Sequence, residues 1–193
     1  MDKLILTDID GVVLNWVDGF HDWMQDKGYT KIPSNDYWIE SCYQDMTSEQ
    51  GNSLVVEFNS SNRIIGLDPV RDAVTGIAKL TAAGYTFHAI TAMGECDHIK
   101  RQRRINLDTL FGTGVFTDLT LTPVAGDKVT PLSQYAQSGK YWIEDTVQHA
   151  TLGLKLGLTP LLMDHVYNKE CDVVGIKRVN CWDDICDLIL GTT

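Results

Sequence analysis

Two carboxylates, Asp8 and Asp10, follow directly after the short apolar run 4–6. In an extended turn, residues two apart point the same way, so these carboxylates would repel one another. A divalent cation relieves that repulsion, and Mg²⁺ favours carboxylate oxygens. The same pair, followed by Gly11, also suits an Asx-turn that closes a strand. The pair alone therefore leaves a metal site and a simple turn both open.

A second acidic pair, Glu144-Asp145, follows the apolar run 141–143. One of these acids could complete a metal site with the first pair. Alternatively, Asp145 or Thr146 could cap a helix that begins at Val147, because acidic residues favour that end of a helix. Both roles are compatible.

Thr91 and Lys128 also follow predicted strands. Thr91 could donate its hydroxyl and a backbone N–H to a phosphoryl oxygen, or could simply end a strand. Lys128 could neutralise phosphoryl charge, or could be one exposed lysine among several. The basic cluster 100–104 could form a solvated helix face or raise the local anion concentration. His88, within an apolar segment, is expected to be a hydrogen-bonded core histidine.

The elements that position these residues alternate between strands and helices. Apolar runs predict strands at 4–6, 85–91, 115–122, 141–143 and 161–163, and periodic stretches predict helices at 97–111, 131–137, 147–156 and 182–190. A further helix is expected to start at Asp68-Pro69, with Val74 in its buried stripe. This alternation predicts an α/β fold with a parallel sheet. The carboxyl ends of its strands would bring the candidate residues into one crevice.

Residues 15–67 do not fit the alternation. The stretch 15–27 is amphipathic, and Thr47 to Gln50 form a capping-box pattern before another helix. We therefore expect a three-layer, Rossmann-like core made of residues 1–14 and 68–193. A small helical cap, residues 15–67, would be inserted after the first strand.

Composition narrows the classes of function. The chain has 193 residues, 44% of them hydrophobic, which suits one core domain with a modest insertion. Its formal net charge of −10 disfavours a polymeric nucleic acid partner. No stretch approaches the roughly 20 apolar residues of a membrane span, and the start lacks a secretory pattern. A cytoplasmic protein without a membrane partner is expected.

The cysteines indicate a reducing compartment. They stand at positions 42, 96, 171, 181 and 186, an odd count with no C-x-x-C spacing. Reduced thiols are therefore expected, in preference to disulfides or a zinc site.

Taken together, the candidate residues resemble the motifs of the haloacid dehalogenase-like hydrolase superfamily. Four pieces occur in that superfamily's order, namely Asp8-Ile-Asp-Gly-Val-Val, Ile90-Thr91, Lys128 and Ile143-Glu144-Asp145. The resemblance spans nearly the whole chain outside the cap. It implies a phosphatase, because dehalogenases lack a proton shuttle at the position of Asp10.

A narrower resemblance is to the 5'(3')-deoxyribonucleotidases and their bacterial and phage relatives. It rests on Asp8 to Phe20, with Trp16 and Gly19-Phe20, on Asp68-Pro69-Val70, and on Asp164-His165-Val166-Tyr167-Asn168. Two positions depart from the group's pattern. The acidic pair is Glu144-Asp145 where the group usually has Asp-Asp, and Ala92 stands where many members have Ser.

The resemblance implies a role for each catalytic residue. Asp8 would attack phosphorus and form an aspartyl-phosphate. Asp10 would protonate the leaving oxygen and then take a proton from the hydrolytic water. Thr91 and Lys128 would bind the phosphoryl oxygens and spread their developing charge.

The resemblance also implies a Mg²⁺ site. Its ligands would be the Asp8 carboxylate, the Asp10 backbone carbonyl and Asp145. Glu144 would support these ligands from behind.

The implied substrate is a small phosphomonoester, with a nucleoside monophosphate preferred. Trp16, Phe20, Thr91 and Ala92 are the expected substrate contacts. Trp16 could stack on a base or could belong to the core of the cap. Two other functions stay open: a phosphatase of a sugar phosphate or other small metabolite, and a catalytically idle domain that binds a nucleotide or partner. A homodimer is compatible with each.

Overall fold

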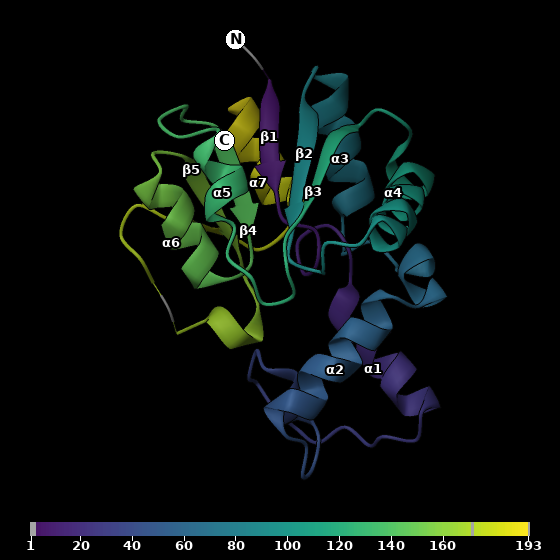
Figure 1. Cartoon of the computed structure of the whole chain (residues 1–193). Helices are drawn as coiled ribbons and strands as arrows, with labels where there is room; N and C mark the ends of the chain where they lie inside the picture. The colour runs from purple at the N-terminus through teal and green to yellow at the C-terminus, as the bar shows by residue number, and fades with distance from the viewer. Residues whose placement is uncertain (1–2, 171, 193) are drawn as a thin grey trace.

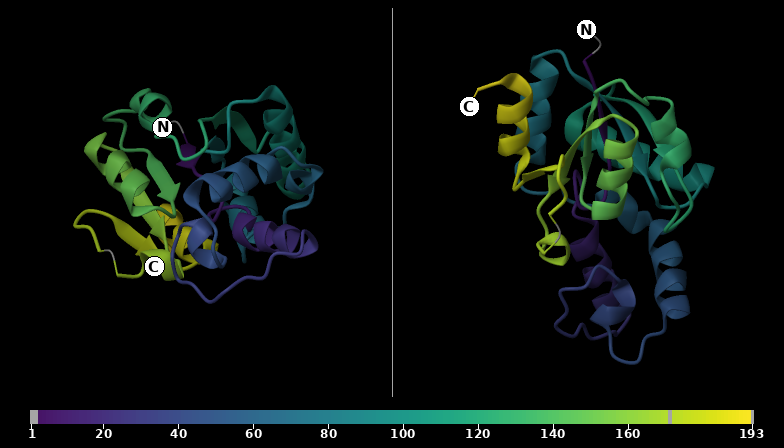
Figure 2. Two further views of the ribbon diagram at one scale, coloured as in Figure 1. Left: turned by 60° about the horizontal axis from the view of Figure 1, so that its bottom comes forward. Right: turned by 90° about the vertical axis from the view of Figure 1, so that its left-hand side faces the viewer.

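The computed structural model describes residues 3–170 and 172–192, in which a parallel sheet is covered by helices on both faces (Figures 1 and 2). The described strands are β1 (Leu4–Thr7), β2 (Thr86–Thr91), β3 (Phe116–Leu121), β4 (Tyr141–Glu144), β5 (Thr159–Met163) and β6 (Lys177–Val179). They run in the order β3-β2-β1-β4-β5-β6, and every neighbouring pair is parallel. The α/β class predicted from the alternation is confirmed.

Alternate residues of each strand pack into different layers. In β1, Ile5 belongs to a cluster with α3 (Ala73–Ala82), α4 (Asp97–Phe111) and α7 (Trp182–Leu190), whereas Leu6 packs with α5 (Val129–Ser133) and the end of α6 (Val147–Lys155). Because side chains alternate across a strand, the sheet is buried on both sides. The three layers are those predicted.

The segment between β1 and α3 forms a separate group of helices at the carboxyl ends of the strands (Figure 1). It contains α1 (Trp16–Asp26), η1 (Ile39–Cys42), α2 (Ser48–Asn59) and η2 (Asn62–Gly66). Thr47 begins α2 with the capping box that the sequence predicts, since its side chain accepts from Gln50 N at 3.2 Å. Buried Phe20 and Phe58 join α1 to α2.

The predicted start of a helix at Asp68-Pro69 is too early, because α3 begins only at Ala73. Residues 68–70 run instead beside residues 13–15: Asn15 N donates to Asp68 O at 2.9 Å, and Val70 N donates to Val13 O at 3.0 Å. This pairing returns the chain to the core alongside its exit from β1. Val74, expected in the buried stripe, is 41% exposed.

Smaller differences lie at the sheet edge and in α5. The edge strand β6 is not predicted by the sequence, since its three residues, Lys-Arg-Val, show no apolar pattern. The helix expected at 131–137 is α5, which starts and ends earlier than predicted.

Among the described residues, no helix combines the length and the hydrophobicity that a membrane span requires. The cysteines at 42, 96, 181 and 186 are free thiols, while Cys171 lies outside the described residues. His88 is a hydrogen-bonded core residue, as expected: its Nδ1 and Nε2 lie 2.7 Å from Tyr135 Oη and 2.8 Å from Thr120 Oγ1.

Candidate active site

The turn after β1 brings the first acidic pair against the second. Asp8 N donates to Ile143 O at 2.8 Å, which joins the end of β1 to β4. Gly11 has a φ of +81°, and a β-carbon there would overlap the Asp145 carboxylate. Glycine alone meets both demands at little cost, because it lacks that atom and accepts positive φ. The turn can therefore approach Asp145 closely.

Lys128 lies between two buried carboxylates. Its Nζ is 2.9 Å from Asp8 Oδ2 and 2.9 Å from Glu144 Oε2. The Lys128 side chain is only 1% exposed, so the alternative of a solvated surface lysine is wrong. The two acids raise the pKa of Lys128 despite the opposing effect of burial, and the ammonium group stays charged.

Glu144 is held by the backbone around it. Its Oε1 accepts hydrogen bonds from Asp145 N at 3.0 Å, Thr146 N at 3.0 Å and Thr146 Oγ1 at 3.1 Å. Burial favours the neutral acid, but the Lys128 charge and these donors prevail and lower the pKa of Glu144 to about 2. Thr146 occupies the N-cap position of α6 and makes no side-chain cap bond, so the capping bond considered for Thr146 is not observed.

The carboxylates of Asp8, Glu144 and Asp145 offer oxygen atoms that all lie within 4.8 Å of one another. Burial, followed by the charges of Glu144 and Asp8, raises the pKa of Asp145 well above its ordinary value. Burial raises the pKa of Asp8 to about 7, although the Lys128 charge opposes that shift. If all three acids ionise, they carry more negative charge than Lys128 offsets, and a divalent cation would relieve their repulsion, so this donor set fits such a cation.

Asp10 faces a different cation. Its Oδ1 is 2.6 Å from Nη2 of Arg103, and its Oδ2 accepts from Thr91 Oγ1 at 3.3 Å. Burial raises the pKa of Asp10, and the Arg103 and Lys128 charges oppose that shift. The structure therefore brings Thr91 to Asp10, as expected from their strand ends, and adds Arg103.

Arg103 is a site residue that the sequence interpretation misses, because it stands within the basic cluster 100–104. The sequence holds a usable signal: Ile99, Arg103 and Leu107 are spaced by four residues, so they share one helical face. All three are buried in α4. A charged residue on the apolar face of a predicted helix, such as Arg103, thus indicates a buried ion pair.

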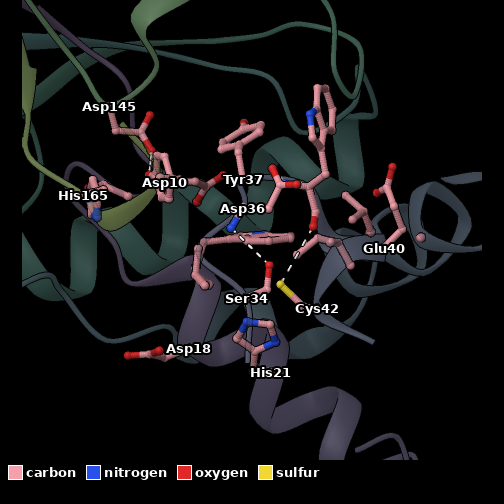
Figure 3. A pocket seen from close by; sticks show the side chains of 18 of the residues that line it. Asp10, Asp18, His21, Ser34, Asp36, Tyr37, Glu40, Cys42, Asp145 and His165 are labelled. Carbon is pink, nitrogen blue, oxygen red and sulfur yellow. Dashed lines mark hydrogen bonds between the residues drawn. The ribbon is translucent and has the colours of Figure 1, made fainter. Parts of the chain in front are cut away.

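A cavity of about 450 Å³ opens beside these groups, between the core and the helices inserted after β1. Figure 3 shows Asp10, Asp145 and His165 on one side of it, and Asp36 and Glu40 on another. Ala92 and Trp16, two of the expected substrate contacts, line this cavity.

Trp16 and Phe20 occupy different positions relative to the cavity. Trp16 is half-buried, its Nε1 donates to Asn59 Oδ1 at 2.8 Å, and its ring stacks on Phe20 at 4.9 Å. Phe20 is completely buried and is absent from the cavity lining. The predicted contact of Phe20 with substrate therefore has no support from the cavity lining, and Phe20 packs behind Trp16.

The segment 164–168 braces Asp145 from the other side. Tyr167 donates its hydroxyl to Asp145 Oδ2, and Asn168 Nδ2 donates to Asp145 O at 2.7 Å. Arg178 Nη1 in turn donates to Asn168 Oδ1 at 2.7 Å. The sequence resemblance indicates this segment but gives it no role. Its contacts fix both the carboxylate and the backbone of Asp145.

Comparison with known proteins agrees with this fold. No protein-family model matches the sequence. An uncharacterized 32.4 kDa protein from the Gp30-rIII intergenic region of Enterobacteria phage T4 is 27% identical in an alignment of 195 residues that covers 96% of this chain and 69% of the phage protein.

Solved structures align along nearly the whole chain. A haloacid dehalogenase-like family hydrolase from Streptococcus pneumoniae matches with a TM-score of 0.64 at 13% identity, over 97% of this chain and 98% of its own. The D,D-heptose 1,7-bisphosphate phosphatase from B. bronchiseptica, complexed with magnesium and phosphate, matches with a TM-score of 0.60 at 15% identity, over 99% of each chain. CbbY from Rhodobacter sphaeroides, in complex with phosphate, matches with a TM-score of 0.63 at 13% identity, over 96% of each chain. The chain has the fold of the haloacid dehalogenase-like hydrolases.

Proposed function

We propose that this chain is a Mg²⁺-dependent phosphatase that hydrolyses a small phosphomonoester through an aspartyl-phosphate intermediate. The observation that carries the proposal is the buried group Asp8, Lys128, Glu144 and Asp145 at the carboxyl ends of β1 and β4. A nucleophilic carboxylate next to a fixed cation and a cluster of acidic oxygens suits attack on a phosphoryl group.

In the first step, a carboxylate oxygen of Asp8 attacks phosphorus, and the bond from phosphorus to the leaving oxygen breaks. The electron pair of that bond passes to the leaving oxygen, which takes a proton from Asp10. In the second step, water attacks phosphorus, Asp10 accepts a proton from it, and the bond to Asp8 breaks. Inorganic phosphate and free Asp8 result.

The remaining groups of the site would bind the metal ion and the phosphoryl oxygens. Asp8, Asp145 and the Asp10 backbone carbonyl would hold Mg²⁺, with Glu144 supporting them. The cation would supply positive charge next to the phosphoryl oxygens. Thr91 and Lys128 would hold those oxygens during both steps, and Lys128 already lies 2.9 Å from the proposed nucleophile.

We further propose that residues 15–67 act as a cap and that the substrate is a nucleoside monophosphate. Support comes from Trp16, which lines the cavity and whose ring is held by Phe20 and Asn59. An indole fixed in this way can stack on a base without losing further conformational freedom.

The charge of the cavity supports a leaving group without a second phosphate. Asp18, Asp36 and Glu40 line it, and Lys31 is the only lysine or arginine among the described lining residues. One protein of this fold is named as the phosphatase of a heptose bisphosphate. A second phosphate would here face the carboxylates of the inserted segment. A sugar monophosphate remains the alternative substrate.

Phosphate release from a panel of nucleoside, sugar and simple alkyl monophosphates, with and without Mg²⁺, tests the proposal. We expect release with Mg²⁺, loss in chelator, and a decrease by orders of magnitude in kcat for Asp8→Asn. If no monophosphate is hydrolysed while a nucleotide still binds, the chain is an idle binding domain. Activity of Asp8→Asn within about threefold of wild type would refute the mechanism.

A further inference from the structure

Arg103 is a fully buried cation that the proposed mechanism does not use. Its side chain is 0% exposed, and its Nη2 lies 2.6 Å from Asp10 Oδ1. Its Nε points to the sulfur of Met93 at 3.3 Å, and its Nη1 is buried without a hydrogen-bond partner among the described residues. Asp10 is thus the ion-pair partner that offsets the burial of this guanidinium group.

The helix that carries Arg103 is anchored on both sides of it. Gln102 Nε2 donates to Asn62 Oδ1 at 2.9 Å, and Asn106 Nδ2 donates to Ile65 O at 2.9 Å and to Leu67 O at 3.1 Å. These bonds join α4 to η2, where the inserted segment returns to the core. The guanidinium group is therefore presented from a fixed backbone.

The two cations of the site serve different carboxylates. Lys128 pairs with Asp8 and Glu144, whereas Arg103 pairs with Asp10. The other Asp10 oxygen has a weaker contact, the Thr91 hydroxyl at 3.3 Å. Without Arg103, the Asp10 carboxylate would be free to turn, including toward Lys128. A turned carboxylate could not meet the leaving oxygen.

We propose that Arg103 is a positioning residue that sets the orientation of Asp10 for proton transfer. The inference rests on the proposed phosphatase function and extends it to a residue on α4. Arg103 acts through Asp10, so its removal should impair the steps in which Asp10 moves a proton and spare substrate binding.

The test compares Arg103→Met and Arg103→Lys with Arg104→Met. Arg104 is the neighbouring arginine of α4, and it contacts Phe116 O and Asp108 instead of Asp10. With alkyl monophosphates, whose leaving oxygen needs a proton, Arg103→Met should lower kcat by about tenfold or more with KM nearly unchanged. With activated aryl phosphates the loss in the first step should be smaller. Arg103→Lys should recover part of the lost activity, and Arg104→Met should behave as wild type.

A double substitution gives a second readout. If Arg103 acts through Asp10, adding Arg103→Met to Asp10→Asn should cause no further loss of kcat. Equal losses on both leaving groups, a further loss in the Asp10→Asn background, or unchanged kcat in Arg103→Met would each overturn the inference. If Arg103→Met does not fold, Arg103→Lys is assayed on the same two substrates, and unchanged leaving-group dependence with lowered kcat would refute positioning. Wild-type protein inactive on the whole panel would instead refute the proposed phosphatase.

Discussion

At the scale of single residues, the main feature of the site is that its charged side chains are buried. Asp8, Glu144 and Lys128 are almost completely removed from solvent, and their charges are offset chiefly by one another. A buried ion pair gains little over apolar packing, but loss of one partner is costly because the other charge remains buried. A gain in stability therefore does not explain this arrangement, whereas the proposed phosphoryl transfer does.

Removal of Lys128 should destabilise the fold as well as abolish activity. Lys128→Met leaves Asp8 and Glu144 as adjacent buried acids, so we expect the free energy of unfolding to fall by about 3–5 kcal/mol. Denaturant unfolding without added metal measures this change. Lys79→Met is the matched control, because the Lys79–Asp183 pair is exposed on the surface and should contribute little. A Lys128→Met protein as stable as wild type would contradict this view of the cluster.

The two adjacent acids should respond differently to Mg²⁺. Both oxygens of Glu144 already accept hydrogen bonds from Lys128, Asp145 N and Thr146, whereas Asp145 contributes its carboxylate to the cluster from beside the cavity. Asp145→Ala should therefore raise the Mg²⁺ concentration needed for half-maximal activity far more than Glu144→Ala does. Activity measured over a range of Mg²⁺ concentrations gives this value for each variant. A larger increase for Glu144→Ala than for Asp145→Ala would identify Glu144 as the metal ligand.

At the scale of elements, periodic patterns predict most of the scaffold. The helices at 15–27 and 97–111 and the strand ends bearing Asp8, Thr91 and Glu144 follow from apolar spacing, because burial of one face sets that spacing. The early helix start predicted at Asp68 is wrong, since residues 68–70 pair with residues 13–15 and this long-range contact has no local signal. The pairing of Arg103 with Asp10 spans 93 residues, so only the folded chain reveals it.

The turn between β1 and α1 should be sensitive to a small substitution at Gly11. Gly11→Ala adds both the strain of a positive φ and an overlap with the Asp145 carboxylate. We expect activity to fall by at least about tenfold and the free energy of unfolding to fall by more than about 1 kcal/mol. Gly28→Ala separates the two effects, because Gly28 also has positive φ, at +89°, but a β-carbon added there would meet no atom within 4 Å.

Thermal unfolding and phosphate release measure both glycine variants. Gly28→Ala should retain activity and show only the backbone cost. Equal behaviour of the two variants would mean that the close approach of the turn to Asp145 has no part in the site.

At the scale of the whole molecule, the cavity lies where two differently built parts meet. The sheet presents its strand ends, while the inserted segment presents Trp16 and residues 34–40 and 42. Figure 3 labels Ser34, Asp36, Tyr37, Glu40 and Cys42 among them. Asn59 links the parts, because it accepts from Trp16 Nε1 and its Nδ2 donates to Met93 O at 3.2 Å. The sequence indicates the helical insertion by its break in alternation, but nothing local predicts which of its side chains face the strand ends.

Substitution of Trp16 therefore tests whether the substrate carries a base, because this residue lies where the two parts meet. Its ring stacks on Phe20, and the residue lines the cavity, so base stacking and packing within the inserted segment both have a structural basis. If the ring stacks on a base, Trp16→Ala should cut kcat/KM for nucleoside monophosphates by about tenfold or more, as expected for loss of roughly 1–3 kcal/mol. Hydrolysis of a small phosphate without a base should barely change.

Loss of packing against Phe20 and Phe58 should make Trp16→Ala less stable in either case. The two interpretations are therefore distinguished by the ratio of kcat/KM for nucleoside monophosphates to kcat/KM for a phosphate without a base. Trp16→Phe is the matched variant: it keeps an aromatic face but loses the hydrogen bond to Asn59. It should retain most of the nucleotide preference if stacking matters, with a lowered melting temperature. Parallel losses on both substrates in Trp16→Ala would remove the stacking role and favour a phosphatase of a sugar phosphate or another small metabolite.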